Sequence, residues 1–437
     1  MVDRLRILFC PMDAIGHINA CLGIADLMSK RNHESLFVVA EDWKNAIIKE
    51  GYPAEVYEEE KIDAPNDGDS GNDLESWSNL WKVDDSPNTS QVDRDGKVLR
   101  EVFKKLVIQV KCRHKYLEKL IANYKPDLIV VDTLVSLPSV ECCGIPWIGI
   151  WSANPIRMFA SDCPPADSGL PTTSERALWD QFQARLESYF MDIRDEFAKW
   201  FQQYGVKLTS PDFLNDSPHL NLYPYPAEVD YTDLAPAPDG WFRLDGLIRK
   251  PSTSIPVPTN FLSKTGKKIY LSLGSLGSGN QGLMTKLIAI LSKVPYLVLL
   301  SLGPHASQYK LSDNMFGEKF VNQLEILPHV DLVITHGGNN TVIECLHAGK
   351  PMIVLPIFGD QPDNAQRLQE KGLGARIDTF SFTEEQLLEA IEKLINDDAL
   401  KSRLAKISEQ LKKSERGQEA AKILEKIALE HRKSQSK

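Results

Sequence analysis

The stretch 331–356, DLVITHGGNNTVIECLHAGKPMIVLP, decides the fold of this chain. An apolar run ends at His336 and a pair of glycines, and a helical pattern begins directly after them. A second apolar run, MIVLP, follows that helical pattern. Short apolar runs that alternate with helical patterns are typical of parallel β/α units. The stretch therefore predicts two neighbouring strands of a parallel sheet, joined by a glycine turn and a helix.

The glycine turn predicts an anion-binding site. Glycine lets the backbone approach a ligand closely, and the free N–H groups and dipole of a helix start attract phosphate. His336, Asn340 and Thr341 add side-chain donors. Glu344 lies one turn into the helix, where it can accept a hydrogen bond from a ribose hydroxyl, although a solvated helix position would also suit it. We expect a diphosphate at this turn.

The same alternation occupies two separate parts of the chain. A length of 437 residues also favours two domains rather than one. The predicted fold class is α/β, with two Rossmann-like doubly wound domains that face a cleft. Strands are expected at 6–10, 34–40, 128–132, 147–151, 268–274, 296–301, 331–336 and 352–356. Helices are expected at 18–30, 43–50, 98–124, 281–292, 340–348, 361–371, 383–396, 399–411 and 417–430.

Between these regions the pattern changes. Residues 61–97 are rich in Asp, Asn, Ser and Gly and predict a mobile loop, in which Trp77 and Trp81 are packing anchors rather than ligand contacts. Residues 174–204 have the spacing of one or two amphipathic helices. Prolines are frequent in 224–260, which favours a linker without regular structure. The expected domains are 1–245 for the acceptor and the chemistry, a linker at 246–260, 261–415 for the donor, and a C-terminal helix at 416–437 that packs back on the first domain.

Composition excludes several classes of function. The net charge of −10, without a long basic run, disfavours nucleic acid as a partner. No apolar run reaches the roughly 20 residues that span a bilayer, and the N-terminus reads as a strand, so we expect no membrane association and a cytoplasmic, monomeric protein. The seven cysteines show no C-x-x-C spacing and are expected to be reduced thiols. A nicotinamide dehydrogenase is disfavoured because no G-x-G-x-x-G follows the first strand.

The longer run 320–366, FVNQLEILPHVDLVITHGGNNTVIECLHAGKPMIVLPIFGDQPDNAQ, resembles the donor signature of the family-1 UDP-glycosyltransferases. The resemblance implies the fold called GT-B and a UDP-sugar donor. Without a leader or an anchor in its sequence, the chain resembles the soluble bacterial-like type that also occurs in plant-feeding mites. It departs from the family at Phe320, where tryptophan is usual, and at Asn322, where proline is usual.

The resemblance also implies a role for each matching residue. Phe320 would stack on uracil and the backbone of Val321 would meet the base edge, Gln323 and Glu344 would hold the ribose, and Asp360 and Gln361 would bind sugar hydroxyls. In plant members this glutamine accompanies glucose. The loop 273–275 resembles a second phosphate-side loop. The complete set of expected donor-site residues is Gly16, Ser272, Gly274, Ser275, Phe320, Val321, Gln323, His336, Gly338, Asn339, Asn340, Thr341, Glu344, Asp360 and Gln361.

Residues 11–17, PMDAIGH, follow the first strand and resemble the family's catalytic motif, so His17 is the expected general base. A helix start disfavours the imidazolium and would keep the ring neutral. Asp132 ends the strand LIVVD and would orient the ring. A polar cap is the competing interpretation of either residue, as it is for Asp360. The expected reaction is transfer of glucose from UDP-glucose, with inversion and without metal or cofactor, to a hydroxyl of a small lipophilic acceptor such as a flavonoid, phenol or xenobiotic, for detoxification.

Two other functions stay open at this point. One is a different enzyme of the same fold, a UDP-N-acetylhexosamine transferase or epimerase. The other is a non-catalytic protein that binds a UDP-sugar. His17 and Asp132 argue against the second, because a binding protein has no need of a base and its orienting carboxylate.

Overall fold

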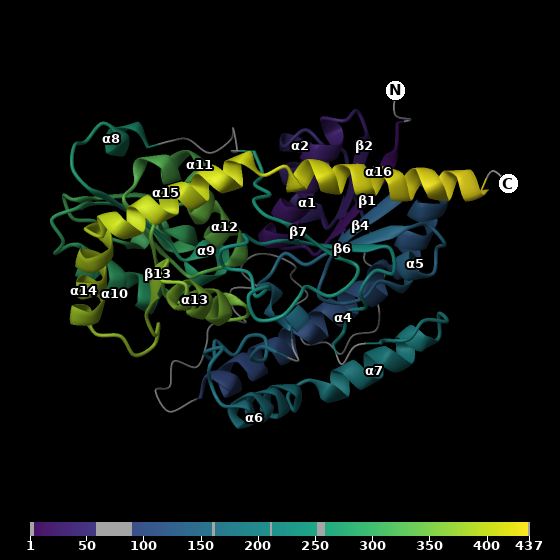
Figure 1. Ribbon diagram of the computed structural model, residues 1–437, viewed down its shortest axis with the longest axis horizontal. Helices are drawn as coiled ribbons and strands as arrows, with labels where there is room; N and C mark the ends of the chain where they lie inside the picture. The colour runs from purple at the N-terminus through teal and green to yellow at the C-terminus, as the bar shows by residue number, and fades with distance from the viewer. Residues whose placement is uncertain (1–3, 58–89, 160–161, 210–211, 251–257, 436–437) are drawn as a thin grey trace.

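The structure is a computed structural model, and it describes residues 4–57, 90–159, 162–209, 212–250 and 258–435. Two parallel sheets, each flanked by helices, form two lobes that lie side by side (Figure 1). We call residues 4–250 together with the C-terminal helix the first lobe, and residues 258–413 the second lobe. This arrangement confirms the predicted α/β class with two Rossmann-like sheets.

The sheet of the first lobe has the strand order β3-β2-β1-β4-β5-β6-β7 among the described residues. Strands β1 and β4 are adjacent and in parallel register, with Cys10 opposite Val131 and Pro11 opposite Asp132. All of β4 is buried because helices cover both faces of the sheet. The shared carboxyl ends of β1 and β4 therefore bring the segment after Pro11 beside Asp132. The strands are β1 (Arg6–Pro11), β2 (Glu34–Val39), β3 (Ala54–Val56), β4 (Leu128–Asp132), β5 (Trp147–Ile150), β6 (Leu220–Pro224) and β7 (Trp241–Leu244).

The helices of the first lobe include one that begins earlier than the sequence predicted. Helix α4 starts at Gln91, so 91–97 is helical rather than part of a loop, whereas the expected anchors Trp77 and Trp81 lie outside the described residues. Ser90 caps it by accepting from the N–H of Asp93, and Gly96 leaves room for the ring of Tyr189. The helices are α1 (Ile15–Ser29), α2 (Glu41–Lys49), α4 (Gln91–Tyr124), α5 (Pro138–Glu141), η1 (Pro155–Phe159), α6 (Arg176–Glu187) and α7 (Met191–Gln202).

The proline-rich segment 224–260 contains regular structure, contrary to the prediction. Strand β7 (Trp241–Leu244) pairs with β6 at the edge of the first sheet. Strand β7 contains no proline, and the proline of β6, Pro224, is its last residue. The other residues of the two strands therefore all have a backbone N–H that can donate to a neighbouring strand. Proline density over a long window therefore concealed a strand of four residues.

The second sheet has the order β10-β9-β8-β11-β12-β13 in the described part of the chain. Its strands are β8 (Lys268–Ser272), β9 (Leu297–Ser301), β10 (Met315–Glu318), β11 (Leu332–Thr335), β12 (Met352–Val354) and β13 (Gly374–Arg376). Its helices are α8 (Thr259–Leu262), α9 (Gly274–Gly277), α10 (Gln281–Leu291), η2 (Gly303–Gln308), α11 (Gln323–Ile326), η3 (Leu327–His329), α12 (Asn339–His347), α13 (Gln361–Glu370), α14 (Glu384–Ile395) and α15 (Asp398–Lys413). A capping box begins α14, with Thr383 and Gln386 as its partners.

Helix α16 (Arg416–Gln435) leaves the second lobe and lies along the first, as the yellow helix in Figure 1 shows. Glu425 accepts hydrogen bonds from Arg31 and contacts the ring of His33 at 2.8 Å. Arg432 forms a two-pronged ion pair with Asp127. Together, these contacts fix the C-terminal helix to the edge of the first sheet. Of the described helices, none is both long and apolar enough to cross a membrane.

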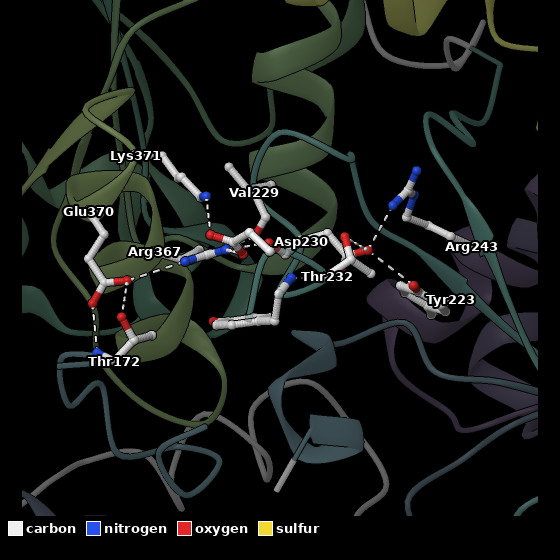
Figure 2. A network of polar contacts seen from close by, with 11 residues as sticks. Thr172, Tyr223, Val229, Asp230, Thr232, Arg243, Arg367, Glu370 and Lys371 are labelled. Carbon is white, nitrogen blue, oxygen red and sulfur yellow. Dashed lines mark hydrogen bonds and ion pairs between the residues drawn. The ribbon is translucent and has the colours of Figure 1, made fainter. Parts of the chain in front are cut away.

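A buried arginine of the second lobe contacts the backbone of the first lobe. Arg367 of α13 is 3% exposed, and its guanidinium donates to the carbonyls of Val229 and Asp230 (Figure 2). The Asp230 carboxylate in turn accepts from Arg243 at 2.9 Å and from the hydroxyl of Tyr223 at 3.1 Å. Because a buried guanidinium is costly without partners, this network favours one relative placement of the two lobes.

Candidate donor and catalytic site

A cavity of about 1470 Å³ lies between the lobes and is lined by residues of both. Every residue that the sequence predicted for the site lines this cavity, with the exception of Asp132. Asp132 is 1% exposed and lies directly behind His17, to which it is hydrogen-bonded. Residues as distant in sequence as Gly16 and Gln361 are thereby brought to one place. Ligand sites in open α/β folds lie at this carboxyl edge of the strands.

His17 and Asp132 form a dyad. Nδ1 of His17 lies 2.8 Å from Oδ1 of Asp132, and the hydroxyl of Ser152 lies 3.2 Å from the same Nδ1. An ionised carboxylate can only accept, so the proton of the neutral ring belongs on Nδ1 and is shared between these two oxygens. Nε2 is then left as an acceptor. This is the geometry of a general base held by an orienting carboxylate.

The pKa of His17 depends on more than the helix start that the sequence analysis considered. His17 is the third residue of α1, yet its pKa is raised above the usual value. Burial lowers the pKa, but the charge and hydrogen bond of Asp132 and the charge of Asp360 together outweigh it. The two carboxylates near the ring therefore decide the direction of the pKa shift, rather than the dipole of the helix.

The start of α12 is open toward the cavity. Its N-cap is Gly338, which has no side chain to cap the first turn. The side chains of Asn339 and Asn340 instead reach across to the first lobe. Asn340 Nδ2 donates to the carbonyl of Gly16 at 3.0 Å, and Asn339 Nδ2 donates to the carbonyls of Ser152 and Pro224 at 2.8 and 3.3 Å. Residues 338–341 line the cavity, so the free N–H groups and the dipole of this helix start are available there, and the anion site stays a prediction.

His336 lies between two glycines. A Cβ atom at Gly274 would lie 2.7 Å from the ring, and one at Gly338 would lie 2.6 Å from Nε2, so both positions require glycine for space, and Gly274 has a positive φ of 72° as well. Burial lowers the pKa of His336 to about 4. The ring is therefore neutral at pH 7 and presents one N–H donor. Ser272 and Ser275 line the same part of the cavity.

The predicted ribose end is a small polar cluster. Nε2 of Gln323 donates to Glu344 at 2.5 Å and to the hydroxyl of Thr341 at 3.4 Å. Glu344 is 5% exposed, and burial raises its pKa. Arg249, which sequence reasoning missed, has its Nε 3.7 Å from Glu344 and also lines the cavity. The ring of Phe320 is 46% exposed at the end of this cluster, so one of its faces is available to a flat ligand.

The predicted sugar end centres on Asp360 and Gln361. Oδ2 of Asp360 accepts from the N–H of Asn154 at 2.8 Å and from Asn364 at 3.2 Å. Asp360 occupies the N-cap position of α13 but makes no cap hydrogen bond, so the capping interpretation is wrong. Oε1 of Gln361 accepts from two N–H groups of its own loop, at Ile357 and Phe358, which leaves its Nε2 as the group that can donate to a ligand.

Two further carboxylates lie at this end. Asp363 accepts from the N–H groups of Asp167 and Gly169 at 2.6 and 2.7 Å and so ties a loop of the first lobe to α13. Burial, followed by the charge of Asp360, raises the pKa of Asp167 to about 7. The sugar end of the cavity is thus rich in carboxylates.

A cluster of aromatic rings forms part of the wall that the first lobe contributes. Phe103 stacks on Phe213 with ring centroids 4.2 Å apart, and Phe190 packs against the same pair at 5.3 and 6.0 Å. These rings and Trp151 line the cavity. The sequence left open whether Phe190 and Trp151 line an acceptor pocket or belong to the core, because an aromatic residue in an apolar pattern does not reveal which face borders a cavity. Ser152 and Asn154 were missed because they lie in a segment without a motif.

Comparison with solved structures identifies the architecture. A crystal structure of the glycotransferase of kitacinnamycin is similar to this chain at a TM-score of 0.69 with 20% identity, and the match covers 98% of this chain and 100% of that chain. The two facing parallel sheets are therefore the GT-B glycosyltransferase fold.

Sequence comparisons indicate which glycosyltransferases this chain is similar to. Residues 259–415 match the family model described as UDP-glucoronosyl and UDP-glucosyl transferase. UDP-glucuronosyltransferase 2B7 of Homo sapiens is 26% identical over 371 residues, which is 77% of this chain and 67% of that protein, so the match spans about two thirds of the relative. Demethyllactenocin mycarosyltransferase of Streptomyces fradiae is 22% identical over 96% of this chain and 86% of its own length. Residues 259–415 thus match the UDP-glucuronosyl and UDP-glucosyl transferase family, and the chain is similar to members of that family over most of its length.

Proposed function

We propose that this protein transfers a hexose, glucose, from UDP-glucose to a hydroxyl of a small lipophilic acceptor such as a flavonoid, phenol or xenobiotic. The observation that carries the proposal is the single cavity that joins the family's donor residues in the second lobe to the His17–Asp132 dyad in the first. A protein that only binds a UDP-sugar has no use for an oriented base at this point. The wall of Phe103, Phe190 and Phe213 suits an apolar, flat acceptor. Detoxification by conjugation is the role that we assign to such a reaction.

The mechanism follows from the dyad. Nε2 of His17 takes the proton of the acceptor hydroxyl, the freed oxygen forms a bond to the anomeric carbon, and the bond from that carbon to UDP breaks on the opposite face. The configuration therefore inverts. The leaving diphosphate takes the negative charge, which the start of α12 and neutral His336 stabilise without a metal ion.

The charges at the sugar end favour a neutral hexose over a uronic acid. Asp360 and Asp167 lie close enough for each other's charge to matter, and Asp363 lies beside them. Burial raises the pKa of Asp360 to about 6, so this carboxylate keeps most of its charge at pH 7, and a sugar carboxylate beside it would meet a like charge in a partly desolvated cavity. We therefore expect UDP-glucose to be preferred to UDP-glucuronate.

The test is a turnover assay with UDP-glucose, UDP-glucuronate and UDP-N-acetylglucosamine against a panel of flavonoids and phenols, read by mass spectrometry. A β-glucoside from the α-linked donor, formed equally in EDTA, is expected. His17→Ala should lower kcat by about 10²–10⁴-fold while calorimetry shows UDP binding unchanged. Binding of UDP without turnover of any acceptor would instead support the non-catalytic alternative, and faster transfer from UDP-N-acetylglucosamine would support the other enzyme class.

A further inference from the structure

The start of α12 does more than face the donor, because its first residue also touches the segment that supports the catalytic base. Asn339 is 5% exposed, and its Nδ2 lies 2.8 Å from the carbonyl oxygen of Ser152 and 3.3 Å from that of Pro224. Carbonyl oxygens can only accept, so the amide nitrogen must face them and the orientation of the side chain is fixed. These hydrogen bonds go to the first lobe, whereas the resemblance of the sequence to the donor signature had placed Asn339 among the donor-site residues.

Ser152 carries this contact to the base. Its hydroxyl lies 3.2 Å from Nδ1 of His17, the atom that also bonds Asp132, and the residue is 7% exposed. One residue therefore meets the ring through its side chain and α12 through its carbonyl. A parallel link runs from Asn340 to the carbonyl of Gly16, the residue directly before His17.

Resting on the proposed function, we infer that Asn339 is a positioning residue for His17 that acts through Ser152. It sets the distance between the helix start that holds the diphosphate and the base that activates the acceptor. The two groups belong to different lobes, and a displacement of about 1 Å at a reacting centre can cost about a hundredfold in rate. Asn339 does not itself touch the reacting atoms.

Asn339→Ala is the direct test, because it removes the amide group that donates to the two carbonyls and adds no charge near the phosphates. We expect kcat to fall roughly tenfold to a hundredfold, with the KM for the donor and the calorimetric affinity for UDP unchanged within about threefold. Asn314→Ala is the matched control: its Nδ2 also donates to backbone carbonyls, those of Leu291, Val294 and Tyr296, but it lies away from the cavity. Asn314→Ala should change the melting temperature and leave kcat alone.

A double-mutant cycle tests the route through Ser152. Ser152→Ala keeps the carbonyl but removes the hydroxyl that meets the ring, so in that background Asn339→Ala should lower kcat by less than about threefold. A loss of UDP affinity with kcat intact would overturn the inference in favour of a donor contact. An equal loss of kcat in both backgrounds, or no loss at all, would overturn it as well. If Asn339→Ala does not fold, Asn339→Ser takes its place, because serine keeps one short hydrogen-bond donor. The same double-mutant cycle with Ser152→Ala then decides the outcome.

The inference and the proposed function can fail separately. If the unsubstituted protein shows no turnover, the proposed function fails. The ring resonances of His17 can still be followed by NMR without any acceptor. A shift of these resonances in Asn339→Ala but not in Asn314→Ala supports the positioning role, and unchanged resonances overturn it.

Discussion

Nδ1 of His17 lies 2.8 Å from Oδ1 of Asp132, although 115 residues separate them in sequence. The parallel register of β1 and β4 produces this contact, since it sets Pro11 opposite Asp132 at the carboxyl ends of both strands. The contact within the dyad thus comes from the register of the first sheet, whereas most of the donor residues lie in the second lobe.

Asp132→Asn should lower kcat by about 10²–10⁴-fold and also lower the pKa of His17. The sign follows from the causes: the charge and hydrogen bond of Asp132 raise this pKa, while burial lowers it. The acidic limb of the kcat/KM profile should therefore move to lower pH in the variant. A pH–rate profile of both proteins measures the shift, and an acidic limb that stays in place would show that another group titrates there.

Phe320→Ala should weaken UDP binding by about 1–3 kcal/mol, the usual contribution of one aromatic ring stacked on a base. The ring is 46% exposed, so its removal should leave the free energy of unfolding almost unchanged. Phe320→Trp offers a larger face and should bind UDP more tightly. Isothermal calorimetry with UDP measures all three proteins, and an unchanged affinity in Phe320→Ala would exclude stacking at this position.

Gly274→Ala should weaken UDP binding at least tenfold because the new methyl group would push the ring of His336 out of place. Gly51→Ala is a suitable control. Both glycines have positive φ, at 72° and 91°, so each substitution costs about 1 kcal/mol or more of stability through backbone strain. The two variants differ in the space around the new methyl group, since nothing lies within 4 Å of a Cβ at Gly51. Equal UDP affinity in the two variants would contradict the proposed role of the ring.

Glu425→Gln should reduce the free energy of unfolding by roughly 3 kcal/mol, because it leaves Arg31 and His33 facing a neutral group at a buried contact. Its hydrogen bonds to Arg31 lower the pKa of Glu425. A carboxylate whose pKa is lowered by folding stabilises the protein fully at pH values above its unfolded pKa, about 4.3. This stabilisation is lost as the pH falls through the lower pKa of the folded protein. The difference between variant and parent should therefore shrink below about pH 4.

Urea denaturation between pH 3 and 7 checks this expectation. Glu409→Gln removes an exposed pair with Lys413 and should cost no more than about 0.5 kcal/mol at any pH. Equal costs for the two variants would mean that α16 contributes little to the stability of the first lobe.

The sequence was most informative where apolar runs were long and motifs marked their ends. The strand LIVVD was placed correctly as β4, and the helix after the glycine turn as α12. Short edge strands escaped prediction: β10 and β13 have four and three residues, too few for a periodic pattern. The start of α4 escaped because its composition is that of a loop, and the contacts that favour the helix, such as the Ser90 cap and the packing of Gly96 against Tyr189, do not show as a periodic pattern.

The site was predictable for a different reason. Its residues follow strand ends, where a parallel sheet places ligands whatever the rest of the chain does. What sequence could not show is which atoms those side chains use. Gln361 turns its oxygen to its own loop, and Asn339 reaches the opposite lobe. Orientation of this kind depends on carbonyls supplied by distant segments, which no local pattern reports.

The path of α16 has a consequence for how the chain is made. Glu425 meets His33 across 392 residues, and Arg432 meets Asp127 across 305. Chains emerge from the ribosome N-terminal end first and lobes tend to fold as they appear. Here the first lobe emerges early but lacks a covering helix until the second lobe has been synthesised. An isolated fragment ending near residue 250 would expose the apolar strip that Ala420, Ala421 and Leu424 cover, and should aggregate unless α16 is supplied as a separate peptide.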